Sequence, residues 1–142
     1  LTKLKSAEKE LEKLRREKLQ AEAAKLIETA QTIGQVRVLA HHAGELDANG
    51  VRSLALDLRS RFGSEPAVVA VTGVANNRPV VIVATNEGAR EAGVKAGALV
   101  RVAAGVLGGG GGGKDDIAQG GGQDATKVNE ALDTIRTTIA QA

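Results

Sequence analysis

The chain of 142 residues contains no Cys, Met, Trp or Tyr, and Phe62 is its single aromatic residue. Without Cys it has no disulfide framework, thiol nucleophile or cysteine-ligated metal site. With one Phe and neither Trp nor Tyr, it lacks an aromatic platform on which nucleic-acid bases could stack. The absence of Met leads us to expect a piece of a longer translation product.

Long apolar runs and a strong charge imbalance are also missing. The composition, 42% hydrophobic and 25% charged, is typical of a folded domain. The uncharged stretch 66–77 is too short to span a membrane, and no signal-peptide pattern is present. We therefore expect a cytoplasmic protein without membrane contact. The net charge is only +2, and its excess lies on residues 1–33, which is weak evidence for a polyanionic partner.

Residues 1–33 contain neither Gly nor Pro and predict one long helix. Their apolar residues follow two heptad seams, offset by one residue: Leu4, Ala7, Leu11 and Leu14, then Leu19, Ala23, Leu26, Ala30 and Ile33. Such a helix needs a partner, which is either an upstream segment or a second copy of the chain. Its cations form either a solvated coiled-coil face or a surface that faces RNA; they are Lys5, Lys9, Lys13, Arg15, Arg16 and Lys18.

The remaining residues, 34–142, predict a compact domain of the α+β or small α/β class, with a small mixed sheet flanked by helices. Alternating or continuous apolar runs predict strands at 35–42, 67–72 and 80–85, the last two joined as a hairpin through 76–79. Apolar spacing predicts helices over 51–62, capped by Asp47 or Asn49, over 94–107, and near the end of the chain, capped near Asp124. Residues 86–92 predict a short turn or helix.

Half of the 18 glycines lie in the segment 108–122, GGGGGGKDDIAQGGG. One interpretation is a flexible linker. A second is a phosphate-binding loop of the GxxxxGK type, which is disfavoured because Asp115 stands where that fold needs Ser or Thr. A third is a surface of unshielded backbone N–H groups for an anion or an RNA backbone, supported by Lys114 and by the start of the last helix.

The motif VLGGGGGGKDDIAQGGG, followed by an amphipathic helix, resembles the end of bacterial alanyl-tRNA synthetases. The His pair after the first strand and the hairpin segments PAVVAVTG and PVVIVAT extend the resemblance over essentially the whole chain. The globular part is similar to the DHH-associated glycine-rich domain of some nucleic-acid phosphoesterases. The resemblance implies a coiled-coil arm, residues 1–33, and a globular tRNA-binding domain, residues 34–142.

The same resemblance implies contact with the elbow of tRNA(Ala), where the D and T loops meet, so that aminoacylation and editing centres act on one tRNA. It places the ATP, Mg and Zn sites in upstream domains of the same chain. We therefore expect no catalytic residue, metal ligand or cofactor in this segment.

The candidate nucleic-acid contacts combine the glycine motif with nearby cations and the His pair: Gly109, Gly110, Gly111, Gly112, Gly113, Lys114, Gln119, His41, His42, Arg78 and Arg101. The related phosphoesterases tend to have His where this chain has Lys114, which disfavours hydrolysis and suits a phosphate contact. A solvated Lys114 and a His pair satisfied within the fold are the competing structural interpretations. Two adjacent His without Cys make a metal site a poor alternative.

Three functional hypotheses follow. The leading one is an RNA-binding module of the synthetase. The second is a structural or dimerisation module, in which a homodimer forms through the helical arm and RNA contact is incidental. The third is an autonomous enzyme, a remnant of the phosphoesterases.

Overall fold

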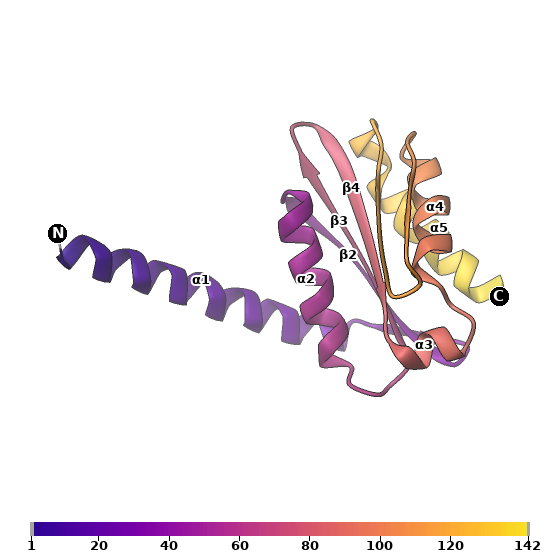
Figure 1. Cartoon of the computed structure of the whole chain (residues 1–142), viewed down its shortest axis with the longest axis horizontal. Coiled ribbons are helices and arrows are strands. Elements are labelled where there is room, and N and C mark those ends of the chain that lie inside the picture. Colours follow the sequence, from indigo (N-terminus) through magenta and orange to yellow (C-terminus); the bar gives the residue numbers. More distant parts are fainter. Residues whose placement is uncertain (1, 142) are drawn as a thin grey trace.

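The computed structural model describes residues 2–141, without the side chains of residues 2–6, 8, 15, 16, 19 and 20. A long helix, α1, projects from a domain in which helices cover both faces of one sheet (Figure 1). In chain order the elements are α1 (Thr2–Glu28), β1 (Gln31–Ile33), β2 (Val36–Glu45), α2 (Ala48–Arg61), β3 (Ala67–Ala75), β4 (Arg78–Thr85), α3 (Glu87–Glu91), α4 (Ala96–Val106), β5 (Gly111–Gly113), β6 (Ile117–Gly121), η1 (Ala125–Lys127) and α5 (Val128–Gln141). Among the described residues, no helix is long and apolar enough to cross a membrane.

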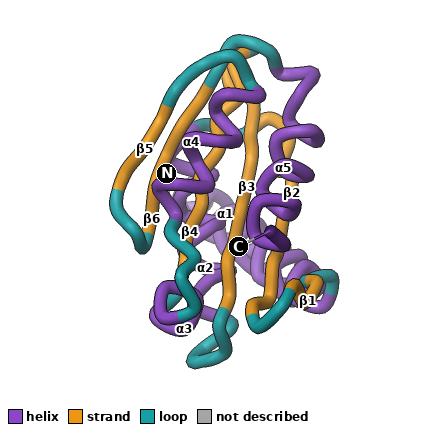
Figure 2. Tube along the Cα trace, turned by 90° about the vertical axis from the view of Figure 1, so that its right-hand side faces the viewer, coloured by secondary structure: helices purple, strands orange, loops and turns teal. Residues whose placement is uncertain are grey.

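The sheet has the strand order β1-β2-β3-β4-β6-β5. Strands β2 and β3 are parallel and joined through α2, whereas every other neighbouring pair is antiparallel. This mixed sheet flanked by helices confirms the predicted fold class. The two short strands β1 and β5 form opposite edges of the sheet, as the trace in Figure 2 shows.

The hairpin of β3 and β4 confirms the sequence prediction. Asn76 and Asn77 at its tip have φ values of 54° and 64°, which a two-residue type I′ turn requires and which Asn tolerates better than most residues. The turn sets a register in which Ala75 pairs with Arg78 and Val68 with Thr85. Both strands are buried because helices lie on the two faces.

Helix α2 also forms as predicted. The carboxylate of Asp47 accepts a hydrogen bond from the N–H of Gly50 at 2.8 Å, which satisfies one of the free donors of the first turn. Val51, Ala55 and Leu58 are buried against β3 and β4. The predicted helix over 94–107 is α4, and the short helix α3 occupies the predicted segment 86–92. Asp124 caps the 3₁₀ turn η1, which leads directly into α5.

Alternate residues of the central strands feed two hydrophobic cores. One lies between the sheet and the layer of α4 and α5, and contains Val68, Ala70, Val81 and Val83. The other lies under α2 and the end of α1, and contains Val69, Val71, Ile82 and Ala84. Since both faces are covered, the strands carry continuous apolar runs rather than an apolar and polar alternation.

The arm differs from its prediction in extent and in partner. Helix α1 ends at Glu28, and residues 31–33 form the edge strand β1 instead of a last helical turn. Part of the second seam packs within the chain, since Ala23 is fully buried and Leu26 and Ala30 lie against the core under α2. No second chain is needed to cover that part.

The first seam is free among the described side chains. Leu11 and Leu14 are 51% and 61% exposed. The side chains of Leu4 and Leu19, and of Lys5, Arg15 and Arg16 among the predicted RNA-facing cations, lie outside the described set.

Candidate nucleic-acid interface

The glycine tract folds as a hairpin at the edge of the sheet, with β6 paired to β4 and β5 paired to β6. The linker interpretation is therefore wrong: the tract is part of the sheet. The phosphate-binding-loop interpretation also fails, because the segment before the tract is helix α4 and the tract enters a strand rather than a helix. Only the backbone-surface interpretation remains compatible with the fold.

Most glycines of the hairpin are required by close packing. A Cβ added to Gly109 would lie 2.1 Å from the Gly121 carbonyl oxygen, and one on Gly111 would lie 2.3 Å from Gly120 Cα. One on Gly122 would lie 2.2 Å from the Leu107 carbonyl oxygen. These contacts let the two arms of the hairpin approach each other and the end of α4 closely, so these residues have a structural reason to be glycine.

Close packing does not require glycine at positions 110 and 112. A Cβ on Gly110 would meet nothing within 4 Å, and one on Gly112 would meet only the Nε of Arg101, at 3.8 Å. Both residues lack a positive φ. Their bare backbone is therefore open to an approaching ligand, and Arg101 of α4 lies beside it.

The turn between β5 and β6 is fixed from several sides. The Asp115 carbonyl accepts hydrogen bonds from the Thr85 hydroxyl and, at 3.0 Å, from the Ala96 N–H. The Asp116 carbonyl accepts from the Thr85 N–H at 2.9 Å and from Arg59 at 3.1 Å. Lys114 thus projects, exposed, from a braced turn.

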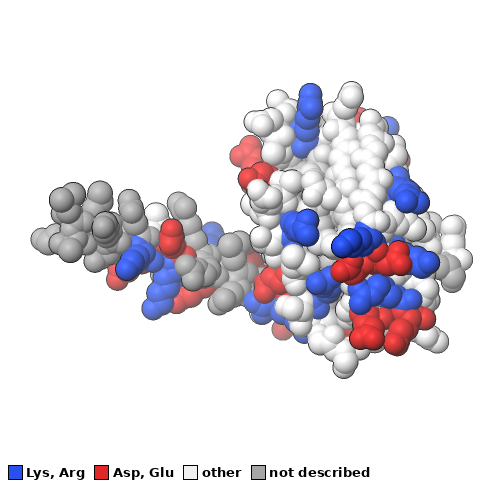
Figure 3. All heavy atoms as spheres, viewed as in Figure 1, with Lys and Arg blue, Asp and Glu red and all other residues white. Residues whose placement is uncertain are grey.

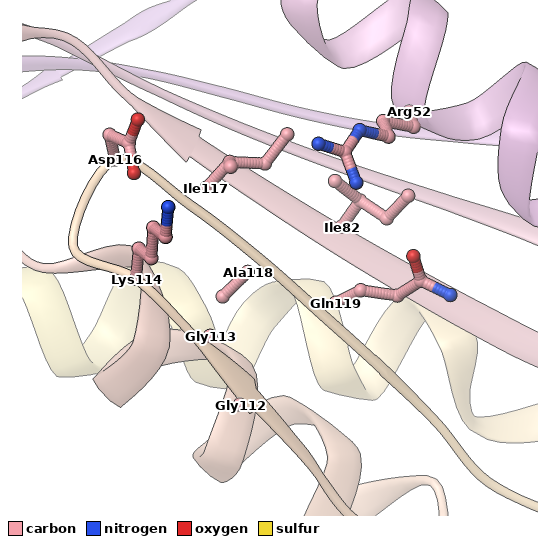
Figure 4. Close-up of a pocket in the computed structure, with 9 residues that line it drawn as sticks. All are labelled: Arg52, Ile82, Gly112, Gly113, Lys114, Asp116, Ile117, Ala118 and Gln119. Atoms are coloured by element: carbon pink, nitrogen blue, oxygen red, sulfur yellow. The ribbon is translucent and has the colours of Figure 1, made fainter.

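A hollow of about 360 Å³ lies along the hairpin on the α2 side of the sheet. Its lining residues are drawn in Figure 4: Arg52, Ile82, Gly112, Gly113, Lys114, Asp116, Ile117, Ala118 and Gln119. The Arg52 guanidinium reaches from α2 over Ile82 toward Ile117, and Lys114 and Asp116 lie together at the turn (Figure 4). The hollow exists because α2 covers β3 and β4 but stops short of β5 and β6.

A second hollow, of about 420 Å³, continues at the other end of β6. Arg78, Gly110 and Gln119 contribute to it, together with Ala48, Ala75, Pro79, Val80, Gly120, Gly121 and Gly122. Gln119 lines both hollows. The structure therefore gathers nine predicted contacts around one hairpin: Gly109, Gly110, Gly111, Gly112, Gly113, Lys114, Gln119, Arg78 and Arg101.

The two predicted histidines lie elsewhere, on β2, which β3 and β4 separate from β6. The Nδ1 of His42 is 2.8 Å from the Thr72 hydroxyl, so this ring has a partner inside the fold. Burial lowers the pKa of His41, the neighbouring His42 lowers it further, and Glu22 of α1 opposes both. The His pair does not join the hairpin, because β3 and β4 lie between β2 and β6 in the sheet.

Sequence reasoning missed Arg52. It lies on a different element, far from the glycines in the sequence, and no motif marks it. Its place in the site follows from the packing of α2 across β4, which no local pattern reveals.

The charge around the hairpin is local rather than global. On the face seen in Figure 3, a few basic side chains stand singly among uncharged atoms in the upper part, with acidic side chains at its left edge, and acidic and basic side chains mix in the lower part. The α5 N-terminus adds little, since the Asp124 carboxylate already accepts hydrogen bonds from the Thr126 N–H and hydroxyl, which lower its pKa. Within the described residues no three His, Asp or Glu side chains form a metal-binding group.

The fold and the two hollows define a small α/β domain with a glycine-rich edge hairpin. The chain belongs to the DHHA1 domain family, whose family model matches residues 35–141. It is 63% identical over 142 residues to the alanine–tRNA ligase of Paenarthrobacter aurescens, covering 99% of this chain and 16% of that protein. The chain thus spans about a sixth of that relative's length.

Solved structures agree with this assignment. The C-Ala domain of Aquifex aeolicus alanyl-tRNA synthetase superposes with a TM-score of 0.71 at 26% identity, over 78% of this chain and 97% of that one. RecJ from Thermus thermophilus, solved with Mg²⁺, shares the fold with a TM-score of 0.58 at 17% identity, over 91% of this chain and 18% of that one. The predicted resemblance to the C-terminal domain of alanyl-tRNA synthetases is confirmed.

Proposed function

We propose that this chain is the tRNA-binding module of an alanine–tRNA ligase. The observation that carries the proposal is the open space beside Gly110 and Gly112, with Arg101 next to Gly112 and the exposed Lys114 two residues further along the chain. A strand backbone without side chains, with cations nearby, suits contact with a phosphate-sugar backbone. The high identity to alanine–tRNA ligases supports tRNA as the nucleic acid.

The proposed target on the tRNA is the elbow. The described residues contain no aromatic side chain besides Phe62, which is buried, so recognition relies on backbone contact, cations and shape. Such contacts position an RNA without reading its sequence. By holding the elbow, the module would help the aminoacylation and editing domains of the parent chain act on one tRNA.

Titration of fluorescein-labelled tRNA(Ala) with the chain, followed by anisotropy, tests the proposal. The logarithm of affinity should fall with the logarithm of salt concentration by about 0.7–0.9 for each phosphate contacted. Lys114→Ala should reduce this slope by about one, the value for one lost phosphate contact. Footprinting should show protection of the tRNA at the elbow. No binding at low salt would overturn the proposal, and an unchanged slope would remove Lys114 from the interface.

We further propose that the chain catalyses no reaction by itself and binds no ATP, Mg or Zn. The Lys114 position supports this, since a cation there suits phosphate binding rather than hydrolysis. Incubation with short oligonucleotides and Mn²⁺ should release no nucleotide. Release that is lost in a Lys114→Ala variant would support the phosphoesterase hypothesis instead.

A homodimer through the arm is the second candidate function, favoured by the exposed Leu11 and Leu14. Two such helices could cover these side chains on each other. Sedimentation of the chain with and without residues 1–18 tests this, because the deletion removes Leu11 and Leu14 and leaves the buried Ala23 and strand β1 in place. A dimer that becomes a monomer on truncation supports the candidate, and a monomer in both cases contradicts it.

A further inference from the structure

The two hollows beside the hairpin follow one another along β6, and we call them together the β6 groove. Gln119 lines both of them, and strand β6 runs beneath from Ile117 to Gly121. At ~3.3 Å per residue, such a strand spans about 13 Å.

Cations are distributed along the β6 groove. Lys114 stands at one end, Arg52 on the wall formed by α2, and Arg78 at the other end. Asp116 is the single acid among the residues that line the two hollows. This arrangement complements a linear polyanion lying along β6 rather than a compact anion bound at one point.

The floor of the groove is apolar and recessed. Ile117 and Val80 are half-buried there, Ile82 is fully buried below them, and the exposed side chain of Gln119 lies between the two hollows. An A-form duplex keeps its bases stacked and presents phosphates and hydroxyls outward. Only an unpaired strand can turn its bases onto such a floor, and a guanidinium plane can then stack on a base in place of an aromatic ring.

We propose that the β6 groove binds a short unpaired RNA segment in extended conformation. Arg52 stacks on one base of the segment, and Arg78 and Lys114 contact its phosphates. The inference rests on the proposed function and deepens it, because it names unpaired RNA as the ligand of the groove. Arg52, which no sequence motif marks, becomes the residue that distinguishes this mode from contact with a duplex surface.

The experiment compares two fluorescein-labelled probes on the full chain, hexauridylate and an eight-base-pair RNA duplex, alongside tRNA(Ala). The hexamer should bind more tightly than the duplex at equal salt. Arg52→Ala should weaken hexamer binding about fivefold or more, the effect of one charge-assisted contact. Arg52→Lys should recover only part of the loss, because it keeps the charge without the plane.

Arg136→Ala is the matched control, since Arg136 lies on α5 and pairs only with the exposed Asp133. It should leave hexamer binding unchanged. If tRNA binds but the duplex binds as well as the hexamer, or if Arg52→Ala has no effect, the inference fails and the proposed function stands. If neither tRNA nor the hexamer binds at low salt, both fail.

Discussion

At the residue scale, neighbouring glycines of one short segment differ in how closely they are packed. Gly111 is held between β6 and α4, where its missing Cβ lets two backbones touch. Gly110, next to it, has open space in the corresponding direction. A substitution therefore separates the structural role from the proposed binding role.

Gly111→Ala should destabilise the chain by about 1–3 kcal/mol, the cost of forcing extra volume into a packed site. Gly110→Ala is the matched control and should change the free energy of unfolding by no more than about 0.5 kcal/mol, while weakening tRNA binding. Urea unfolding measures the first effect and anisotropy the second. Equal stability of the two variants would contradict the assignment of their roles.

His41 makes stability depend on pH. Its pKa in the folded chain is lowered, chiefly by burial, so below its ordinary value of about 6.5 the unfolded chain takes up a proton that the folded site resists. The free energy of unfolding should therefore fall as the pH drops through the region just below 6.5. Urea unfolding at several pH values measures this, and His41→Gln should flatten the dependence. An unchanged slope in the variant would assign the effect to another group.

At the element scale, the sequence predicts those elements whose side chains specify them locally. The strands β3 and β4 carry β-branched runs around an Asn-Asn turn, and α2 has its Asp47 cap and apolar spacing. The hairpin of β5 and β6 was not predicted, because a run of glycine has no side-chain alternation and a low strand propensity. The hairpin forms because β6 pairs with β4 and α4 covers it, and both are tertiary interactions.

The same distinction divides α1 into a docked half and a free half. Leu26→Ala should destabilise the monomer by about 1–2 kcal/mol, less than the 2–5 kcal/mol typical of fully buried Leu, because Leu26 is half-buried against the core. Leu14→Ala, on the free half, should change stability by no more than about 0.5 kcal/mol. Thermal unfolding at low protein concentration compares them. A larger loss for Leu14→Ala would mean that the free half is packed in solution.

At the scale of the whole molecule, the site belongs to no single element. Arg52 comes from α2, Arg78 from β4 and Lys114 from the turn after β5, while Arg101 lies beside Gly112 on the α4 side. Local patterns in the sequence predicted a site at the glycine segment, but tertiary packing determines which cations from distant parts of the sequence lie near it. Tertiary packing also places the His pair on β2, away from the glycine hairpin. With a net charge of only +2, the proposed RNA binding would depend on this local arrangement rather than on the overall field.

Asp116 is the acidic residue among the cations that line the β6 groove. Removing its charge therefore tests directly whether these cations govern RNA binding. Its carboxylate lines the hollow beside Lys114, while its contacts to Thr85 and Arg59 are made by the main-chain carbonyl. Asp116→Asn should therefore preserve the turn and tighten tRNA binding about two- to fivefold at low salt, the effect of removing one like charge a few ångströms from a phosphate in water. Since salt screens such interactions, the gain should shrink toward zero near 0.5 M. Glu130→Gln on α5, covering the opposite face of the sheet, should change affinity little at any salt concentration. A gain of equal size in both variants would mean that net charge, and not the β6 groove, governs binding.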